Sequence, residues 1–198
     1  ELGGSITSGQ IAAGQCHTCA IVEDSANGDG LVKCWGCGGQ GQLGTGADAN
    51  VGGAPGQMGG NLTAANEGLP AASAVLAVGN YSCLTTAGGE LYCWGTAAWL
   101  GAQTNTPTRV PLPFRVAKAA CSEHHCCAVD PDGDVWCWGD GAQGQLGAGV
   151  QSSAPEAAVR VPSASGAGAK DVVVGECFSC ASGGFGLNCW GCSLRRSG

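Results

Sequence analysis

The amino-acid sequence predicts an all-β fold made of about four propeller-type blades, each closed by disulfides between neighbouring strands. Three observations support this prediction. The tripeptide Cys-Trp-Gly recurs four times, an earlier cysteine precedes each copy across a Gly- or Asp-rich turn, and no segment has the apolar spacing of a helix. The 37 glycines among the 198 residues suit many tight turns between short strands.

The Cys-Trp-Gly tripeptide marks the last inner strand of each predicted repeat. Its successive copies are about 50 residues apart, the length of a blade of three or four short strands. An apolar strand opens each repeat, and the tryptophans that end them are Trp35, Trp94, Trp138 and Trp190. We place the repeats at about residues 11–46, 73–103, 114–149 and 170–192 within one propeller segment, residues 1–198.

The first and fourth repeats each contain two Cys-x-x-Cys pairs, a spacing also found in zinc ribbons. Facing residues of an antiparallel hairpin have position numbers with a constant sum, and the two pairs of each repeat share one sum. Residues three apart on a strand point to opposite faces, so four such sulfurs would not meet at one ion. We therefore expect disulfides and no metal, with a zinc site as the alternative. The expected bridges are Cys16–Cys37, Cys19–Cys34, Cys177–Cys192 and Cys180–Cys189.

The two middle repeats keep only the inner cysteine pair, which can form a bridge but not a tetrahedral site. These pairs are Cys83–Cys93 and Cys127–Cys137. Cys121 and Cys126 remain, and they pair by elimination or bond to another chain. Fourteen cysteines indicate an oxidising compartment, so we expect a secreted, extracellular protein.

Two sets of motifs recur in the same order. The first repeat carries His17-Thr-Cys-Ala-Ile21 and later Gly41-Gln-Leu-Gly44, and the third carries His125-Cys-Cys-Ala-Val129 and Gly144-Gln-Leu-Gly147. These motifs resemble the regulator of chromosome condensation repeats, whose family builds propellers of about seven blades. The second repeat loses the Gly-Gln and the fourth lacks Gly-Gln-Leu-Gly. The resemblance covers about residues 11–192 and implies a partial β-propeller of this type.

The polar residues of the repeats predict structural roles and no active site. His17 and His125 stand at equivalent positions, which favours a repeated hydrogen-bonding role over catalysis. The segment Asp130-Pro-Asp-Gly-Asp134 resembles the start of a calcium loop but falls at a hairpin turn, as do Glu23-Asp24 and Asp29. The sequence has no Gly-x-Ser-x-Gly elbow and no phosphate-binding loop. We expect a protein that is not an enzyme and has no cofactor.

The charge and apolar patterns restrict the partners. The net charge of −7, with eight basic residues, argues against nucleic-acid binding, and the one tight basic pair is Arg195-Arg196. No apolar run is long enough to predict membrane insertion. The chain has no initiator Met or leader, which predicts a processed form or a fragment.

Sequons at Asn61 and Asn80 predict N-glycans, the first within a Gly/Ala-rich loop insertion at residues 45–72. Residues 104–113 predict an extended connection.

Four repeats would leave uncovered blade faces and strand edges, so either the chain is a piece of a longer one or the missing blades come from another molecule. In the second case we expect association with another protein or with a second copy. We expect an extracellular structural or interaction module, as a segment of a polymeric or cell-surface assembly. An alternative is a secreted propeller that binds proteins, as the enzyme inhibitors of the family do. A less favoured alternative is an exchange-factor-like scaffold, the role of the founding member of the family.

Overall fold

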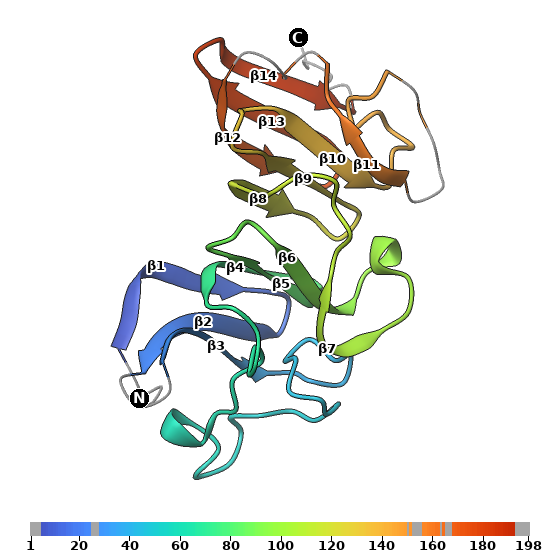
Figure 1. Cartoon of the computed structure of the whole chain (residues 1–198). Helices are drawn as coiled ribbons and strands as arrows, with labels where there is room; N and C mark the ends of the chain where they lie inside the picture. The colour runs from blue at the N-terminus through green and yellow to red at the C-terminus, as the bar shows by residue number, and fades with distance from the viewer. Residues whose placement is uncertain are drawn as a thin grey trace, which may run out of the picture. The chain divides into compact units, whose positions relative to one another are not determined.

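The protein is all-β, as the sequence predicts. A computed structural model describes residues 5–24, 28–149, 151, 156–162, 164 and 168–192. In these ranges the chain forms fourteen strands and two short 3-10 helices, and the strands make four antiparallel sheets (Figure 1). The chain divides into two compact units, Glu1–Pro111 and Leu112–Gly198, and each unit contains two of the sheets.

The first unit contains the first and second blades. The first blade has the strand order β1-β2-β3, with β1 at Ser5–Ala13, β2 at His17–Asp24 and β3 at Gly28–Gly36. The second blade has the order β4-β5-β6-β7, with β4 at Ala72–Val78, β5 at Asn80–Thr86, β6 at Leu91–Thr96 and β7 at Thr104–Arg109. The 3-10 helices η1 and η2 span Gly59–Asn61 and Ala98–Leu100.

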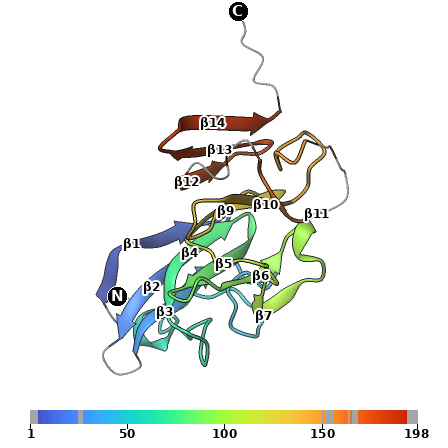
Figure 2. The same cartoon turned by 45° about the horizontal axis from the view of Figure 1, so that its top comes forward.

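The second unit contains the third and fourth blades. The third blade has the order β11-β10-β9-β8, with β8 at Lys118–Cys121, β9 at His125–Val129, β10 at Val135–Gly139 and β11 at Glu156–Arg160. The fourth blade has β12 at Ala169–Val174, β13 at Phe178–Gly183 and β14 at Gly186–Gly191, which lie side by side in Figure 2.

Each blade packs one face against its neighbour within the unit. In the first unit, Cys19 and Val32 of the first blade share a buried cluster with Val75 and Leu84 of the second. In the second unit, the third and fourth blades form an equivalent cluster around Val135 and Val172. Because successive residues of a strand point to opposite faces, each blade presents one set of side chains to the preceding blade and another set to the following blade.

The glycine of each Cys-Trp-Gly tripeptide is required by the backbone. The backbone here has φ angles that residues other than glycine rarely adopt: 109° at Gly36, 102° at Gly95, 105° at Gly139 and 114° at Gly191. A Cβ atom at any of these positions would also collide with the backbone at the start of the neighbouring strand. The tripeptide therefore ends a strand at a point where two chain segments approach too closely for a side chain.

The insertion at residues 45–72 covers the outer edge of the first blade. Two isolated antiparallel bridges connect it to β3, between Gly36 and Val51 and between Lys33 and Ala64. The Asn66 side chain accepts a hydrogen bond from the Val32 amide at 2.8 Å. The second and third blades have a fourth strand at this edge. The insertion thus takes up backbone groups of β3 that would otherwise form an exposed strand edge.

The segment expected to be an extended connection at residues 104–113 begins as a paired strand. Thr104–Arg109 form β7, which hydrogen-bonds to β6. Pro107 lies in this strand, and because β7 is the last strand of its sheet, proline can occupy it without removing a bond to a further strand. Over the described ranges, no helix is both long and apolar enough to cross a membrane.

Candidate functional site

The structure brings together every cysteine pair that the sequence predicts. Four bridges join residues that face each other across the second and third strands of a blade, with Cα atoms 4.0 to 4.1 Å apart: Cys19–Cys34, Cys83–Cys93, Cys127–Cys137 and Cys180–Cys189. Two outer bridges follow the same register at the strand ends, Cys16–Cys37 and Cys177–Cys192. Cys121 and Cys126 pair across β8 and β9.

Each set of four cysteines that suggested a zinc ribbon forms two separate disulfides. Their sulfurs are therefore bonded in pairs and do not surround one point. In the part of the chain that the structure describes, no group of three or more His, Cys, Asp or Glu residues is placed to hold a metal ion.

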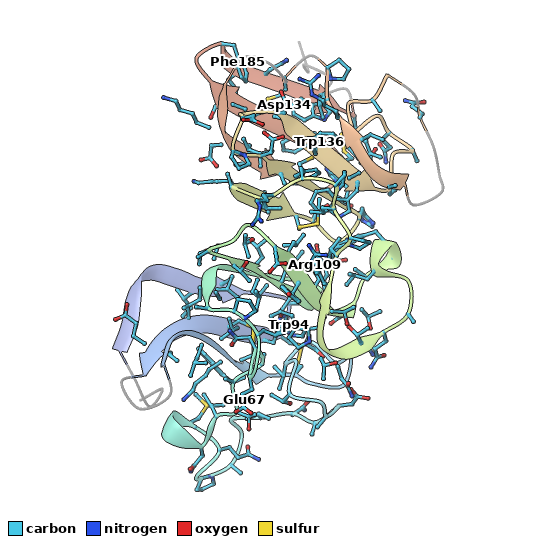
Figure 3. All side chains as sticks on the ribbon, in the orientation of Figure 1. Glu67, Trp94, Arg109, Asp134, Trp136 and Phe185 are labelled. Atoms are coloured by element: carbon cyan, nitrogen blue, oxygen red, sulfur yellow. A yellow bond between two sulfur atoms is a disulfide. The ribbon has the colours of Figure 1, made fainter. Side chains whose placement is uncertain are left out.

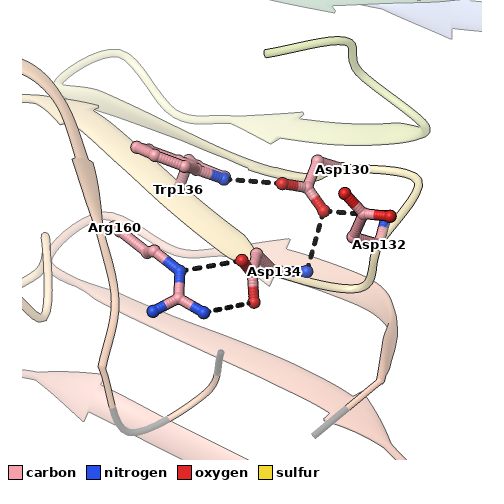
Figure 4. A network of polar contacts seen from close by, with 5 residues as sticks. All are labelled: Asp130, Asp132, Asp134, Trp136 and Arg160. Atoms are coloured by element: carbon pink, nitrogen blue, oxygen red, sulfur yellow. Dashed lines mark hydrogen bonds and ion pairs between the residues drawn. The ribbon is translucent and has the colours of Figure 1, made fainter. Parts of the chain in front are cut away.

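The acidic segment at residues 130–134 is a hairpin turn (Figure 4). The Asp130 carboxylate accepts hydrogen bonds from the amides of Asp132 and Asp134, at 3.0 and 2.9 Å, and from Trp136 Nε1 at 2.9 Å. Arg160 donates two bonds to the Asp134 carboxylate, at 2.8 and 2.7 Å. These protein donors occupy both carboxylates, so the turn explains the acidic pattern without a calcium ion.

Some charged residues named from the sequence lie outside the described part of the chain. The side chains of Asp24 and Asp29 are among them, and so are Arg195 and Arg196. Glu23 lies exposed on β2.

A buried polar cluster links the two blades of the first unit. It consists of His17, Gln42, Ser82 and Trp94, and each has at most 3% of its surface exposed. His17 Nε2 lies 2.8 Å from Ser82 Oγ, and the Ser82 hydroxyl donates to the Gln42 carbonyl oxygen at 2.9 Å. Trp94 Nε1 donates to the same carbonyl oxygen at 2.9 Å (Figure 3 labels Trp94). Since Ser82 has one proton and gives it to Gln42, His17 donates to Ser82 from a neutral ring protonated at Nε2.

The second unit repeats this inter-blade cluster with equivalent residues. His125 Nε2 lies 2.8 Å from Ser179 Oγ, and Ser179 donates to the Gln145 carbonyl oxygen at 3.0 Å. Trp190 Nε1 donates to the same oxygen at 2.9 Å. His17 and His125 therefore make the same hydrogen bond in their own units, as the sequence predicts.

The inter-blade clusters show that the true repeat of this chain is a pair of blades. The first and third blades supply the histidine and the Gly-Gln-Leu-Gly loop, whereas the second and fourth supply the serine and the tryptophan. The glycines that end these loops, Gly44 and Gly147, lie where a Cβ atom would collide with the tryptophan ring of the next blade. Sequence reasoning missed the serines. The signal was present, because Tyr81-Ser-Cys83 and Phe178-Ser-Cys180 share a serine that the other two repeats lack.

A histidine that hydrogen-bonds to a serine is also the arrangement of a general base and a nucleophile. Here both serines are completely buried, with 0% exposure. Each donates its proton to a backbone carbonyl rather than to the histidine. The pair therefore holds two blades together and offers no nucleophile to a substrate.

Acid is expected to destabilise the second unit through His125. Burial lowers the pKa of His125 from 6.5 to about 4, and Asp140 opposes this shift. The unfolded chain therefore binds a proton at His125 at a higher pH than the folded chain does. The free energy of unfolding falls as the pH drops from about 6.5 to about 4. The expected loss is about 3 kcal/mol by pH 4. Burial also lowers the pKa of His17, so the first unit should respond in the same direction.

Urea denaturation at several pH values, with the disulfides intact, measures this effect. Because carboxylates titrate in the same range, the useful quantity is the difference between the wild type and His125→Gln, which cannot be protonated. The neighbouring His124 is exposed and makes the smallest of the three contributions to the shifted pKa of His125, so His124→Gln is the matched control and should change the slope much less than His125→Gln does. Equal slopes for the wild type and His125→Gln would refute a buried neutral histidine.

Comparison with known proteins assigns the repeats. Models of the regulator of chromosome condensation (RCC1) repeat match residues 116–145 and 132–182. The ultraviolet-B receptor UVR8 of Arabidopsis thaliana is 33% identical over 147 residues, covering 70% of this chain and 31% of the receptor. The chain belongs to the RCC1-type repeat family. A human RCC1-like G exchanging factor-like protein is 31% identical over 159 residues, covering 74% of this chain and 31% of that protein.

Solved structures share the RCC1-type fold. Human WBSCR16 superposes with a TM-score of 0.73 at 20% identity, over 92% of this chain and 46% of that one. Prp20p of Saccharomyces cerevisiae superposes with a TM-score of 0.66 at 24% identity, over 91% of this chain and 43% of Prp20p. The CRINKLY WD40 ectodomain of the Arabidopsis thaliana receptor kinase ACR4 superposes with a TM-score of 0.50 at 19% identity, over 95% of this chain and 50% of the ectodomain. The chain spans about a third of the length of the curated relatives described above.

Proposed function

We propose that this chain is an extracellular protein-interaction module that acts through protein contacts and not through chemistry of its own. The observation that carries the proposal is the set of seven disulfides, which includes every cysteine of the chain. Such bridges persist in oxidising compartments and are rare where glutathione keeps thiols reduced. The polar groups that could suggest catalysis are buried within the inter-blade clusters.

The fold is consistent with this proposal. RCC1-type propellers serve as protein-binding modules, and the structure of Prp20p was described together with its binding to Gsp1p and histones. The structure of the ACR4 ectodomain shows that a related fold functions outside a cell. Gsp1p and histones are partners of Prp20p. For this chain the proposal is limited to a protein partner at the cell surface or in the extracellular matrix.

The location and oxidation state can be tested together on protein from its native source. Intact cells are treated with a thiol-alkylating reagent before lysis, and the chain is then analysed by intact mass spectrometry. The proposal expects the chain in the medium or on the cell surface, unalkylated, with seven disulfides. Recovery from the cytosol with alkylated cysteines would disprove the extracellular assignment.

Of the two sequons, only Asn61 is expected to carry an N-glycan. Asn61 is exposed within the insertion, beside a pocket of about 540 Å³ that Leu31, Lys33 and Glu67 help to line. Ser82 of the other sequon is completely buried in the inter-blade cluster, and Asn80 begins β5. A bulky glycan on Asn80 would therefore sit beside a tightly packed interface. Peptide-N-glycosidase treatment should lower the mass of Asn80→Gln but not that of Asn61→Gln, and the reverse pattern would contradict this assignment.

A further inference from the structure

A pocket lies at the outer edge of the first blade, where the insertion at residues 45–72 meets β3. Its volume is about 540 Å³, and it is lined by Leu31 and Lys33 of β3 and by residues 60–64, 67 and 68 of the insertion. This volume falls within the range of ligand pockets in proteins, about 300–1,000 Å³. We call it the edge pocket. None of its lining residues belongs to an inter-blade cluster, so the packing of the blades gives it no role.

The lining of the edge pocket suits a ligand that is polar but uncharged. Leu31 and the buried Leu62 supply apolar surface. Lys33 and Glu67 supply charges of opposite sign, which balance each other (Glu67 is labelled in Figure 3). The ammonium group donates hydrogen bonds, the carboxylate accepts them, and the Thr63 hydroxyl can do both. A sugar ring has matching properties, because its C–H groups form an apolar face and its hydroxyls both donate and accept.

The acceptor asparagine of a sequon stands in the wall of the edge pocket. Asn61, Leu62 and Thr63 line it, and they also line a second pocket of about 230 Å³, which is below the usual ligand range. Asn61 Nδ2 donates to the Gly56 carbonyl oxygen at 2.8 Å. This bond uses one of the two amide protons and leaves the other position for a sugar. A glycan on Asn61 would therefore begin at a fixed point in the pocket wall.

We infer that the edge pocket holds the first sugars of an N-glycan attached to Asn61. The inference rests on the proposed function, because N-glycans are added along the secretory route, and it states where the glycan expected on Asn61 lies. A sugar that is bonded to the wall has a high effective concentration at the pocket, so contacts too weak to capture a free sugar can keep it there.

A glycan in the edge pocket would hold the insertion against β3. Lys33 and Ala64 line the pocket and form one of the two isolated bridges between these segments. Next to that bridge, the Ala65 amide donates to the Val32 carbonyl oxygen at 2.8 Å, and the Val32 amide donates to the Asn66 side chain at 2.8 Å. Sugars that contact both segments would make their separation less frequent, so these two amides should exchange with solvent more slowly.

NMR of the oxidised chain secreted by eukaryotic cells, with ¹³C-labelled N-acetylglucosamine in its glycan, tests the position directly. We expect nuclear Overhauser effects between the first two sugars and the methyl groups of Leu31 and Leu62. The reference is the same chain made with tunicamycin, which prevents N-glycosylation without a substitution. The amides of Val32 and Ala65 should exchange about tenfold or more slowly with the glycan present. The amides of Asp132 and Asp134 in the other unit should keep their rates.

Gly60→Leu and Gly53→Leu are a matched pair of variants. Both glycines are exposed in the insertion, and a Cβ atom at either position would meet no atom within 4 Å. Gly60 lines the edge pocket, whereas Gly53 lines neither pocket. Gly60→Leu should therefore crowd the sugars and reduce the slowing of exchange to about twofold or less, and Gly53→Leu should keep it. Near-ultraviolet circular dichroism and intact mass verify folding and glycosylation, and Glu67→Ala replaces Gly60→Leu if that variant fails either check.

Three results would overturn the inference: a secreted chain without a glycan on Asn61, a glycan without Overhauser effects to Leu31 or Leu62, or exchange at Val32 and Ala65 that the glycan leaves unchanged. None of these results touches the proposed function, which an extracellular, oxidised chain still satisfies. Recovery of the native chain from the cytosol with alkylated cysteines would remove the proposed function. That result comes from the alkylation experiment, which does not depend on where a glycan lies.

Discussion

Reduction with a phosphine under native conditions is expected to unfold both units, whereas EDTA is expected to leave them folded. The bridges close short loops, with sequence separations of 5 to 21 residues. A disulfide contributes typically about 2–4 kcal/mol, mainly by restricting the unfolded chain. Because a folded domain has a net stability of only about 5–15 kcal/mol, loss of the three bridges of the first unit or the four of the second should exceed what remains.

Near-ultraviolet circular dichroism and urea midpoints follow this effect, with the oxidised protein in the same buffer as reference. A variant with Cys83→Ala and Cys93→Ala isolates one bridge and should lose about 2–4 kcal/mol. Unfolding by EDTA alone would show that a metal stabilises the fold. A reduced chain that kept its urea midpoint would show that the blades are held by their cores instead.

Trp94→Ala is expected to lower the free energy of unfolding of the first unit by about 3–5 kcal/mol, the range for truncating a buried aromatic side chain. The Trp94 side chain is completely buried, at 0% exposure, between the two blades. Its removal leaves a cavity next to Gly44, and it also leaves the Gln42 carbonyl with one donor fewer. Urea denaturation of the oxidised protein measures the change.

Two further substitutions show which property of Trp94 matters. Trp94→Phe keeps most of the ring but loses the hydrogen bond, so it should cost less than Trp94→Ala. Trp35→Ala removes the tryptophan at the equivalent position of the first blade, which is only partly buried and should cost about 1–2 kcal/mol. Equal losses for Trp94→Ala and Trp35→Ala would contradict the special role of the inter-blade cluster.

The repeats and the cysteine pairing follow from the sequence because both are local. A disulfide between facing strands is determined by the register of a single hairpin, so position numbers alone identify partners such as Cys19 and Cys34. Glycine after tryptophan likewise reflects a constraint at one point of the backbone, seen at Gly36 and Gly95.

The inter-blade clusters could not be predicted in the same way. His17 bonds to Ser82, which is 65 residues later, and the acceptor that joins them is the backbone carbonyl of Gln42. A carbonyl is present in every residue and leaves no trace in the sequence. The same reason explains the role of residues 45–72, because single bridges from the insertion to β3 depend on backbone groups and not on side-chain patterns.

All seven disulfides lie within single blades, and none joins one blade to another. During synthesis, the partners of each bridge leave the ribosome within a short stretch of chain, so a blade can be oxidised before the next one is made. A blade that is oxidised on its own restricts mispairing to its own cysteines, such as the nested pairs Cys16–Cys37 and Cys19–Cys34, and blades can be added or lost in evolution without leaving a cysteine unpaired.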